Sequence, residues 1–114
     1  MTTKSTFAGL PACANIGDIP ADIAIIGVAH GTVYGLDKPS HSAQAPAAIR
    51  QAAGRYSHML DNYDFDLGGS LLDNRNIRVV DCGDLPGDPF DSAGNQRRTV
   101  DMIRSIVKVG AVPI

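Results

Sequence analysis

The stretch that decides the fold is AIIGVAHGTVYGLDKPSHSAQAPAAIR, residues 24–50. It opens within DIAIIGV, residues 22–28, a short apolar run bounded by turn signals, which is typical of a strand buried on both faces in a parallel sheet. A loop rich in glycine and histidine follows. From residue 45 to about residue 59, apolar residues recur near helical spacing and Pro46 stands where a first helical turn tolerates it, so a helix is predicted.

The same alternation continues towards the end of the chain. IRVVDCGD, residues 77–84, predicts a second strand, followed by a tight loop of proline and glycine. A second helix is predicted over residues 93–109, with Gly110 as its stop signal, and AVPI at 111–114 has the pattern of an opening third strand. Strand, helix, strand, helix and strand together indicate parallel strands joined by right-handed crossovers.

The two predicted helices have distinct faces. In the first, Arg50 and Arg55 are assigned to the face in contact with water. The second carries an apolar stripe for the core, formed by Val100, Ile103, Ile106 and Val107.

Two segments have weaker patterns. Residues 1–21 mix Gly, Pro, Asn and Asp with isolated apolar residues, which predicts an extended arm packed on a surface. Residues 60–76 are rich in Asp, Asn and Gly and are expected to be a long connection, with a short strand near residues 63–66. We therefore divide the chain into an amino-terminal arm, 1–21, and an α/β part, 22–114.

Composition excludes several classes of protein. The chain has 114 residues, which suits one small domain, and its 10 Lys and Arg against 12 Asp and Glu form no basic stripe for nucleic acid. No apolar run is long enough to cross a bilayer, and the polar start has no signal-peptide core, so a cytoplasmic protein without a membrane partner is expected. Cys13 and Cys82 lie far apart in sequence and are interpreted as reduced thiols, Cys82 as an inert core thiol.

Both polar loops follow the carboxyl ends of predicted strands, where ligands gather in parallel sheets. In the loop after the first strand, His30 and Tyr34 are candidate rim residues, because an imidazole and a phenol can orient a small polar ligand. Thr32 and His41 of the same loop complete this set of substrate-loop candidates.

Asp81 and Asp84 end the second predicted strand. As carboxylates at that edge they could be ligands or general bases. Alternatively, they accept hydrogen bonds from loop amides and fix the turn from strand to loop. We favour this structural role.

Nucleotide and metal sites are not favoured by the spacing of the candidate residues. Gly27, Gly31 and Gly35 recur every four residues, which matches neither a dinucleotide nor a P-loop motif and instead indicates a loop that needs positive φ and close backbone approach. The three histidines, at 30, 41 and 58, include no pair at the helical zinc spacing. No metal ligand is assigned.

Several of these features together resemble the ureohydrolase family, which contains the arginases and agmatinases. An early strand ends in IIGV, and the first helix carries a small residue, Pro, two residues, Ile and Arg, here Ala45, Pro46, Ile49 and Arg50. A strand with VVDCGD and a helix running to GAVPI follow. The resemblance covers nearly the whole chain from Phe7 onward and is to the amino-terminal part of the family. The opening arm and the loop GTVYGLDKPSHSA look more similar to agmatinase-like or other guanidino-acid hydrolases than to arginase itself.

The resemblance implies a three-layer α/β/α fold with a parallel sheet, of which the first few β-α units are present here. It also implies two Mn²⁺ ions, a small guanidino substrate, urea as product and assembly into homo-oligomers. The ligands of that family come from GGDHS-like, DAHxD and SxDxDxxDP segments, and none of these is present in the sequence. We therefore expect a truncated, inactive amino-terminal part that binds no manganese alone.

In this frame the loop from His30 to His41 would form part of the wall over the active-site funnel. Two other functions remain open. One is a non-catalytic interaction module that docks on a full-length ureohydrolase, and the other is a small nucleotide-binding domain.

Overall fold

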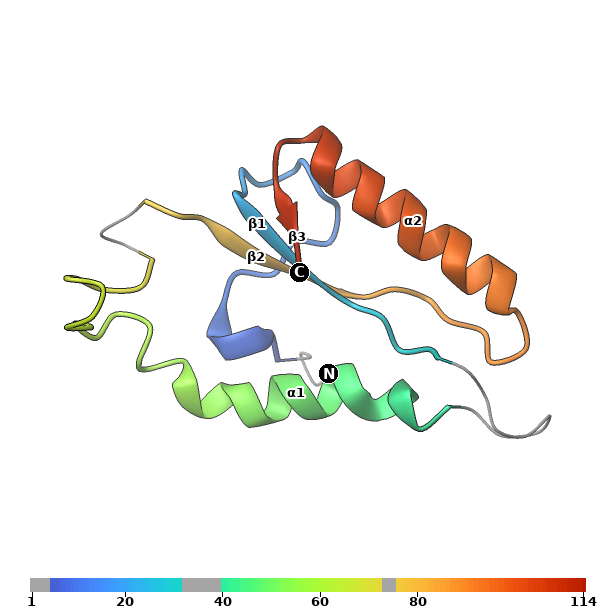
Figure 1. Ribbon diagram of the computed structural model, residues 1–114, viewed down its shortest axis with the longest axis horizontal. Coiled ribbons are helices and arrows are strands. Elements are labelled where there is room, and N and C mark those ends of the chain that lie inside the picture. Colours follow the sequence, from blue (N-terminus) through green and yellow to red (C-terminus); the bar gives the residue numbers. More distant parts are fainter. Residues whose placement is uncertain (1–4, 32–39, 73–75) are drawn as a thin grey trace.

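The computed structural model describes residues 5–31, 40–72 and 76–114 and has a three-stranded parallel sheet at its centre (Figure 1). The strands are β1 (Ile23–Gly27), β2 (Val79–Asp84) and β3 (Val112–Pro113), in the order β2-β1-β3. All three predicted strands are therefore confirmed, each slightly shorter than the predicted run. Central β1 is less buried than predicted, since only Ala24 and Gly27 in it are fully buried.

Two helices lie on opposite sides of this sheet (Figure 1). They are α1 (Ala45–Ala53) and α2 (Ser92–Lys108). The chain passes from β1 to β2 on one side of β1 and then returns to β3 on its other side. Because parallel connections are right-handed, this reversal sends the two helices to opposite faces. The fold is thus a parallel α/β sheet with a helix on each side.

Helix α1 is shorter than the predicted helix over 45–59. A 3₁₀ turn, η2 (His41–Gln44), leads into it, and Pro46 stands in its first turn as predicted. After Ala53 the chain tightens into a second 3₁₀ turn, η3 (Gly54–Tyr56), in which the Ser57 amide donates to Gly54 O. Glycine is a poor helix former, which accounts for the early end of α1.

Helix α2 agrees closely with its prediction, and both of its ends have a physical cause. The Asp91 carboxylate accepts a hydrogen bond from the Gly94 amide at 3.0 Å, which satisfies one of the free donors at the first turn. Gly110 follows the helix with a φ of +86°, a conformation that glycine adopts without strain.

The core is small and lies between the sheet and α2. It consists of Cys13, Ala24, Val80, Ile106 and Ala111. On α2 the half-buried Thr99 and Met102 share the inward face with Asn95 and Ile106.

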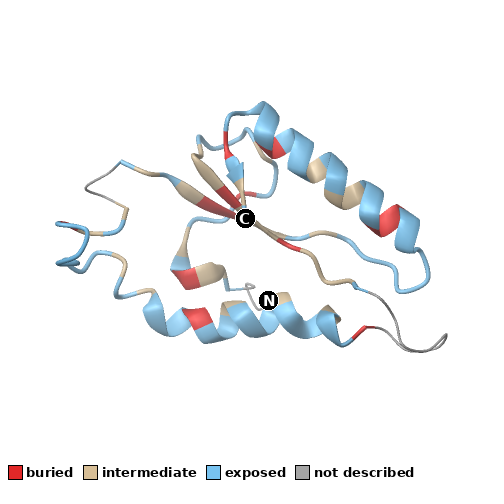
Figure 2. Cartoon of the chain, in the orientation of Figure 1, coloured by how far each residue is buried: buried red, intermediate tan, exposed pale blue. Residues whose placement is uncertain are grey.

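The predicted stripe of α2 is therefore wrong in part. Ile106 is buried, but Val100, Ile103 and Val107 are exposed. Most of the surface of α2 is exposed (Figure 2). The inward face of α2 includes the buried Asn95. Because Asn95 is polar, the apolar pattern of the sequence did not indicate this face.

The chain exposes much of its surface. Its accessible area is 8070 Å², whereas a compact monomer of this mass exposes roughly 6,000 Å². Its radius of gyration is 15.8 Å against about 13 Å for a compact domain of this length. The exposed apolar residues include Val100, Ile103 and Val107 on α2. Val109, Val112 and Ile114, which follow α2 in the chain, are exposed as well, so apolar surface is present on both α2 and β3.

The amino-terminal segment is more structured than an extended arm. It contains a 3₁₀ turn, η1 (Phe7–Gly9), and then runs parallel to β2, where Ala12 pairs with Asp81. The Cys13 amide donates to Asp81 O and the Asp81 amide donates to Pro11 O, each at 2.9 Å. This segment therefore covers the outer edge of β2.

No strand forms at residues 63–66 within the described part of the connection, so that prediction is wrong. An isolated antiparallel pairing of Asp64 with Gly69 closes a turn instead. Asp64 O accepts hydrogen bonds from the amides of Gly68 and Gly69, and Asp64 Oδ1 accepts hydrogen bonds from the amides of Asp66 and Leu67.

Among the described helices, none combines the length and the apolar character that a bilayer crossing requires.

Candidate functional site

Two loops meet beyond the carboxyl ends of β1 and β2, as predicted, and enclose a cavity of about 560 Å³ with the start of α2. Residues 29–31 after β1 and residues 87–89 after β2 line its two sides. Because the strand order reverses at β1, this edge is the kind of crevice in which α/β sheets bind ligands.

His30 lines this cavity but its ring is tied to α2. Its Nε2 lies 3.2 Å from Thr99 Oγ1, and the Thr99 hydroxyl donates to Asn95 O at 2.9 Å. Since the single hydroxyl proton is used for Asn95, Nε2 of His30 must be the donor to Thr99. His30 is thus held by α2 at the inner wall of the cavity.

Asn95 shapes the opposite wall, and the sequence pattern did not point to it. Its buried side chain accepts from the Asp88 amide at 2.9 Å and from Arg98 Nη2 at 2.5 Å, and donates to Asp88 O at 2.7 Å. A buried amide whose oxygen and nitrogen both have hydrogen-bond partners fixes the loop after β2. Its position on the helix face shared with Ile106 was the signal that could have revealed it.

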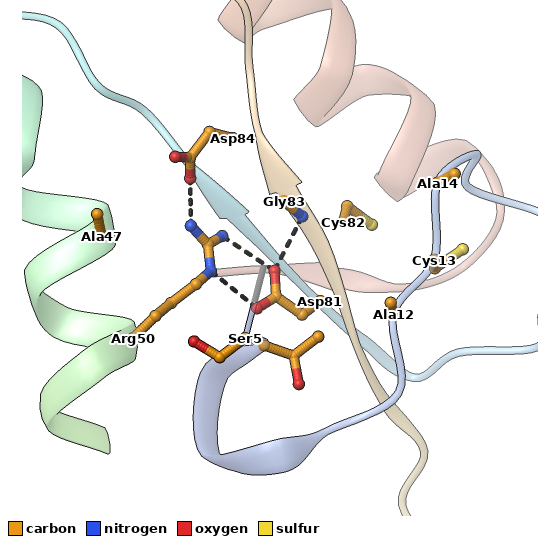
Figure 3. A pocket seen from close by; sticks show the side chains of 11 residues that line it. Ser5, Ala12, Cys13, Ala14, Ala47, Arg50, Asp81, Cys82, Gly83 and Asp84 are labelled. Carbon is orange, nitrogen blue, oxygen red and sulfur yellow. Dashed lines mark hydrogen bonds and ion pairs between the residues drawn. The ribbon is translucent and has the colours of Figure 1, made fainter. Parts of the chain in front are cut away.

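A second cluster lies on the α1 side of the sheet and joins Arg50 to Asp81 and Asp84 (Figure 3). Arg50 Nε lies 2.9 Å from Asp81 Oδ2 and Nη2 lies 3.0 Å from Asp81 Oδ1, which is a two-pronged pair. Arg50 Nη1 also contacts Asp84 Oδ1. Only 11% of the Arg50 side chain is exposed, so the prediction that Arg50 faces water is wrong.

Asp81 is the most buried charge of this cluster, with 1% of its side chain exposed. It accepts the Phe7 amide at 2.7 Å and the Gly83 amide at 2.9 Å in addition to Arg50. Burial favours its neutral form, but the hydrogen bonds from Arg50, Phe7 and Gly83 outweigh burial and lower the pKa of Asp81. Asp81 is therefore a charged residue that ties the amino-terminal segment, β2 and α1 together.

The lowered pKa of Asp81 predicts a loss of stability in acid. A carboxyl group whose pKa is lower in the folded chain stabilises it above the ordinary pKa, 3.8, and loses this effect as the pH falls through the folded value. We expect the urea midpoint of the chain to fall below about pH 4, and to fall less steeply in Asp81→Asn. Asp101→Asn, on the exposed side of α2, is the matched control; equal slopes in all three proteins would contradict the prediction.

The Arg50 cluster leaves no room for a side chain at Gly27. A Cβ atom at this position would clash with Asp84 Oδ1 and would lie 3.1 Å from Arg50 Nη1. The predicted close approach at Gly27 and Gly31 is present, since a Cβ at Gly31 would lie 3.1 Å from Ser40 Oγ. Positive φ is not what these two positions need, because neither has it.

Next to the Arg50 cluster lies a cavity of about 390 Å³, lined in part by Cys13, Cys82 and Asp81 (Figure 3). Both cysteines are free thiols. Burial raises the pKa of Cys82 to about 11, and the neighbouring Cys13 thiol adds to this rise. The structure thus brings together two cysteines that are far apart in sequence.

A model of the arginase family matches residues 21–114. The chain belongs to the arginase family. No curated protein matches this arginase-family chain. The match includes β1, α1, β2, α2 and β3 and begins just before β1.

The candidate residues of this arginase-family chain are divided between two places. His30 lines the cavity on the α2 side, whereas Asp81 and Asp84 bind Arg50 on the α1 side. His41 is exposed at the start of η2. The other two candidates, at positions 32 and 34, lie outside the described residues.

The family is associated with manganese, and the residues that the structure describes do not form such a site. Within 5–31, 40–72 and 76–114, no three His, Cys, Asp or Glu side chains gather closely enough to hold a metal ion. The carboxylates of Asp81 and Asp84 are bonded to a guanidinium group instead.

Proposed function

We propose that this arginase-family chain is the amino-terminal part of a manganese-dependent guanidino-compound hydrolase of the agmatinase type, which releases urea, and that it is inactive alone. The family match over residues 21–114 carries this proposal. In it, residues 1–21 are an amino-terminal arm and residues 22–114 are part of a larger α/β domain that works in the cytoplasm as a homo-oligomer.

The position of the cavity beyond β1 supports a role in substrate binding. The loop that starts at His30 leaves β1 at the point where the strand order reverses, and there an α/β sheet accommodates ligands. We propose that His30, Thr32, Tyr34 and His41 line one wall of the substrate funnel and select among guanidino compounds. His30 is suited to this because Thr99 fixes its orientation.

The exposed apolar surface supports the proposal that the chain alone is inactive. Val107 lies on α2, Val112 lies on β3, and Ile114 follows β3. Each of these three residues is more than half exposed. Apolar surface of this kind is typically covered by further protein in a complete α/β domain. We assign Arg50, Asp81 and Asp84 to the internal structure of the chain and not to the metal.

The proposed function is tested by a chimera in which residues 22–114 replace the matching segment of an agmatinase-type enzyme. We expect it to release urea from agmatine in preference to arginine, guanidinobutyrate and guanidine, whereas the purified chain with Mn²⁺ should release none. A chimera that folds and binds Mn²⁺ but releases no urea would contradict the hydrolase assignment. Urea release by the chain alone would contradict its inactivity.

The loop is tested in the same chimera. We expect His30→Ala and Tyr34→Ala each to raise KM for agmatine roughly tenfold, since each removes a group that would hold the substrate. His58→Ala serves as the matched control because His58 is exposed near η3, away from the cavity residues. Unchanged KM in the two loop variants would remove the loop from the substrate site.

A further inference from the structure

Cys13 and Cys82 lie side by side on two parallel segments. Ala12 pairs with Asp81, and the 2.9 Å hydrogen bond from the Cys13 amide to Asp81 O continues this register. Cys13 and Cys82 are the next residues on each segment, so their side chains point to the same face. Neighbouring strands are about 4.8 Å apart, which is within the range of about 4.4–6.8 Å for the Cα atoms of a disulfide.

Packing supports the same arrangement. Cys13 belongs to the buried core with Ala24 and Ile106, and Cys82 packs against this core. Both sulfur atoms lie on the α2 side of β2 in Figure 3. Cys82 is the less buried of the two, so it is the thiol that a small reagent would reach first.

We propose that Cys13 and Cys82 are a redox-responsive dithiol, which closes to a disulfide when a small-molecule disulfide reaches it and so locks the amino-terminal segment onto β2. The Cys82 thiolate attacks one sulfur of the reagent, forms a mixed disulfide and releases one small thiolate. Cys13 then loses its proton and attacks the Cys82 sulfur, which releases the second small thiolate. Two protein thiols are oxidised, one small disulfide is reduced, and the two protons end on the two small thiols.

The Cys13–Cys82 disulfide would attach the amino-terminal segment to β2 covalently, at a place where hydrogen bonds hold it in the reduced chain. That segment also donates the Phe7 amide to Asp81, so the lock acts directly beside the Arg50 cluster. Because the pKa of Cys82 is about 11, its thiolate is scarce at neutral pH and the pair should oxidise slowly there.

The test uses the full chain equilibrated with mixtures of oxidised and reduced glutathione, with and without concentrated urea. Mass spectrometry of the trapped protein counts the Cys13–Cys82 disulfide. We expect the folded chain to form it at an effective concentration roughly 100-fold higher than the chain in urea, because folding removes the cost of closing a long loop. The rate should also rise with pH, because the thiolate is the attacking species.

Single substitutions provide the controls. Cys13→Ser and Cys82→Ser should each give only the mixed disulfide with glutathione, and Cys82→Ser should give it more slowly because Cys13 is more deeply buried. The proposal would be overturned if the effective concentration of the two thiols in buffer were within a few-fold of the value in urea. That result would mean either that the folded chain does not hold the two thiols in disulfide geometry or that the chain is unfolded in buffer. None of these measurements depends on the proposed hydrolase activity.

Discussion

We expect Arg50→Ala to lower the free energy of unfolding by about 3 kcal/mol or more, because it leaves the charge of Asp81 buried without its main partner. Asp81 would keep the Phe7 and Gly83 amides, but it would lose both bonds to the guanidinium group. The same substitution removes the link between α1 and β2. The measurement is urea unfolding followed by circular dichroism.

Two further variants distinguish this cause from a general effect of removing charge. Arg50→Lys keeps the charge but cannot form the two-pronged pair, so it should recover only part of the loss. Arg78→Ala is the matched control, because Arg78 pairs with Asp22 at the surface and its side chain is 55% exposed. Exposed ion pairs contribute little to stability. Equal losses in Arg50→Ala and Arg78→Ala would contradict the structural role of the Arg50 cluster.

The second large effect is expected at Ile106. This residue is fully buried against Val80 and Ala24, so Ile106→Ala would leave a cavity between α2 and the sheet. Substitutions of this kind cost about 2–5 kcal/mol, and the small size of this core leaves few neighbours to fill the space.

Ile103→Ala is the matched control, since Ile103 lies on the same helix but is 37% exposed. We expect it to cost less than half as much as Ile106→Ala in the same urea experiment. A larger loss in Ile103→Ala than in Ile106→Ala would mean that α2 packs through its predicted stripe, and the orientation described here would be wrong.

The strands and the main helices could be predicted because their signals are local. The apolar runs of β1 and β2, Pro46 at the start of α1 and Gly110 after α2 each act over a few residues. The end of α1 and the strand expected near Tyr63 were wrong. There the choice between a helix, a turn and a strand depends on weak hydrogen bonds that the pattern does not rank.

Only part of the candidate site could be predicted from the sequence. Parallel strand order places the two loops at one edge, so their meeting at a common cavity followed from the sequence. The side chains then diverge, because successive residues of a strand or its extension face opposite sides of the sheet. His30 therefore lies with Thr99 on α2, and Asp81 lies with Arg50 on α1.

By itself, the sequence determined the alternation of strands and helices and the resemblance to ureohydrolases, because both are carried by residues close together in the chain. Only the tertiary structure decided that Arg50 is buried on Asp81, that Cys13 lies beside Cys82, and that Ile106 faces the core. These three are contacts between distant segments. Their formation depends on which face of each element meets its neighbour, and local composition does not specify that.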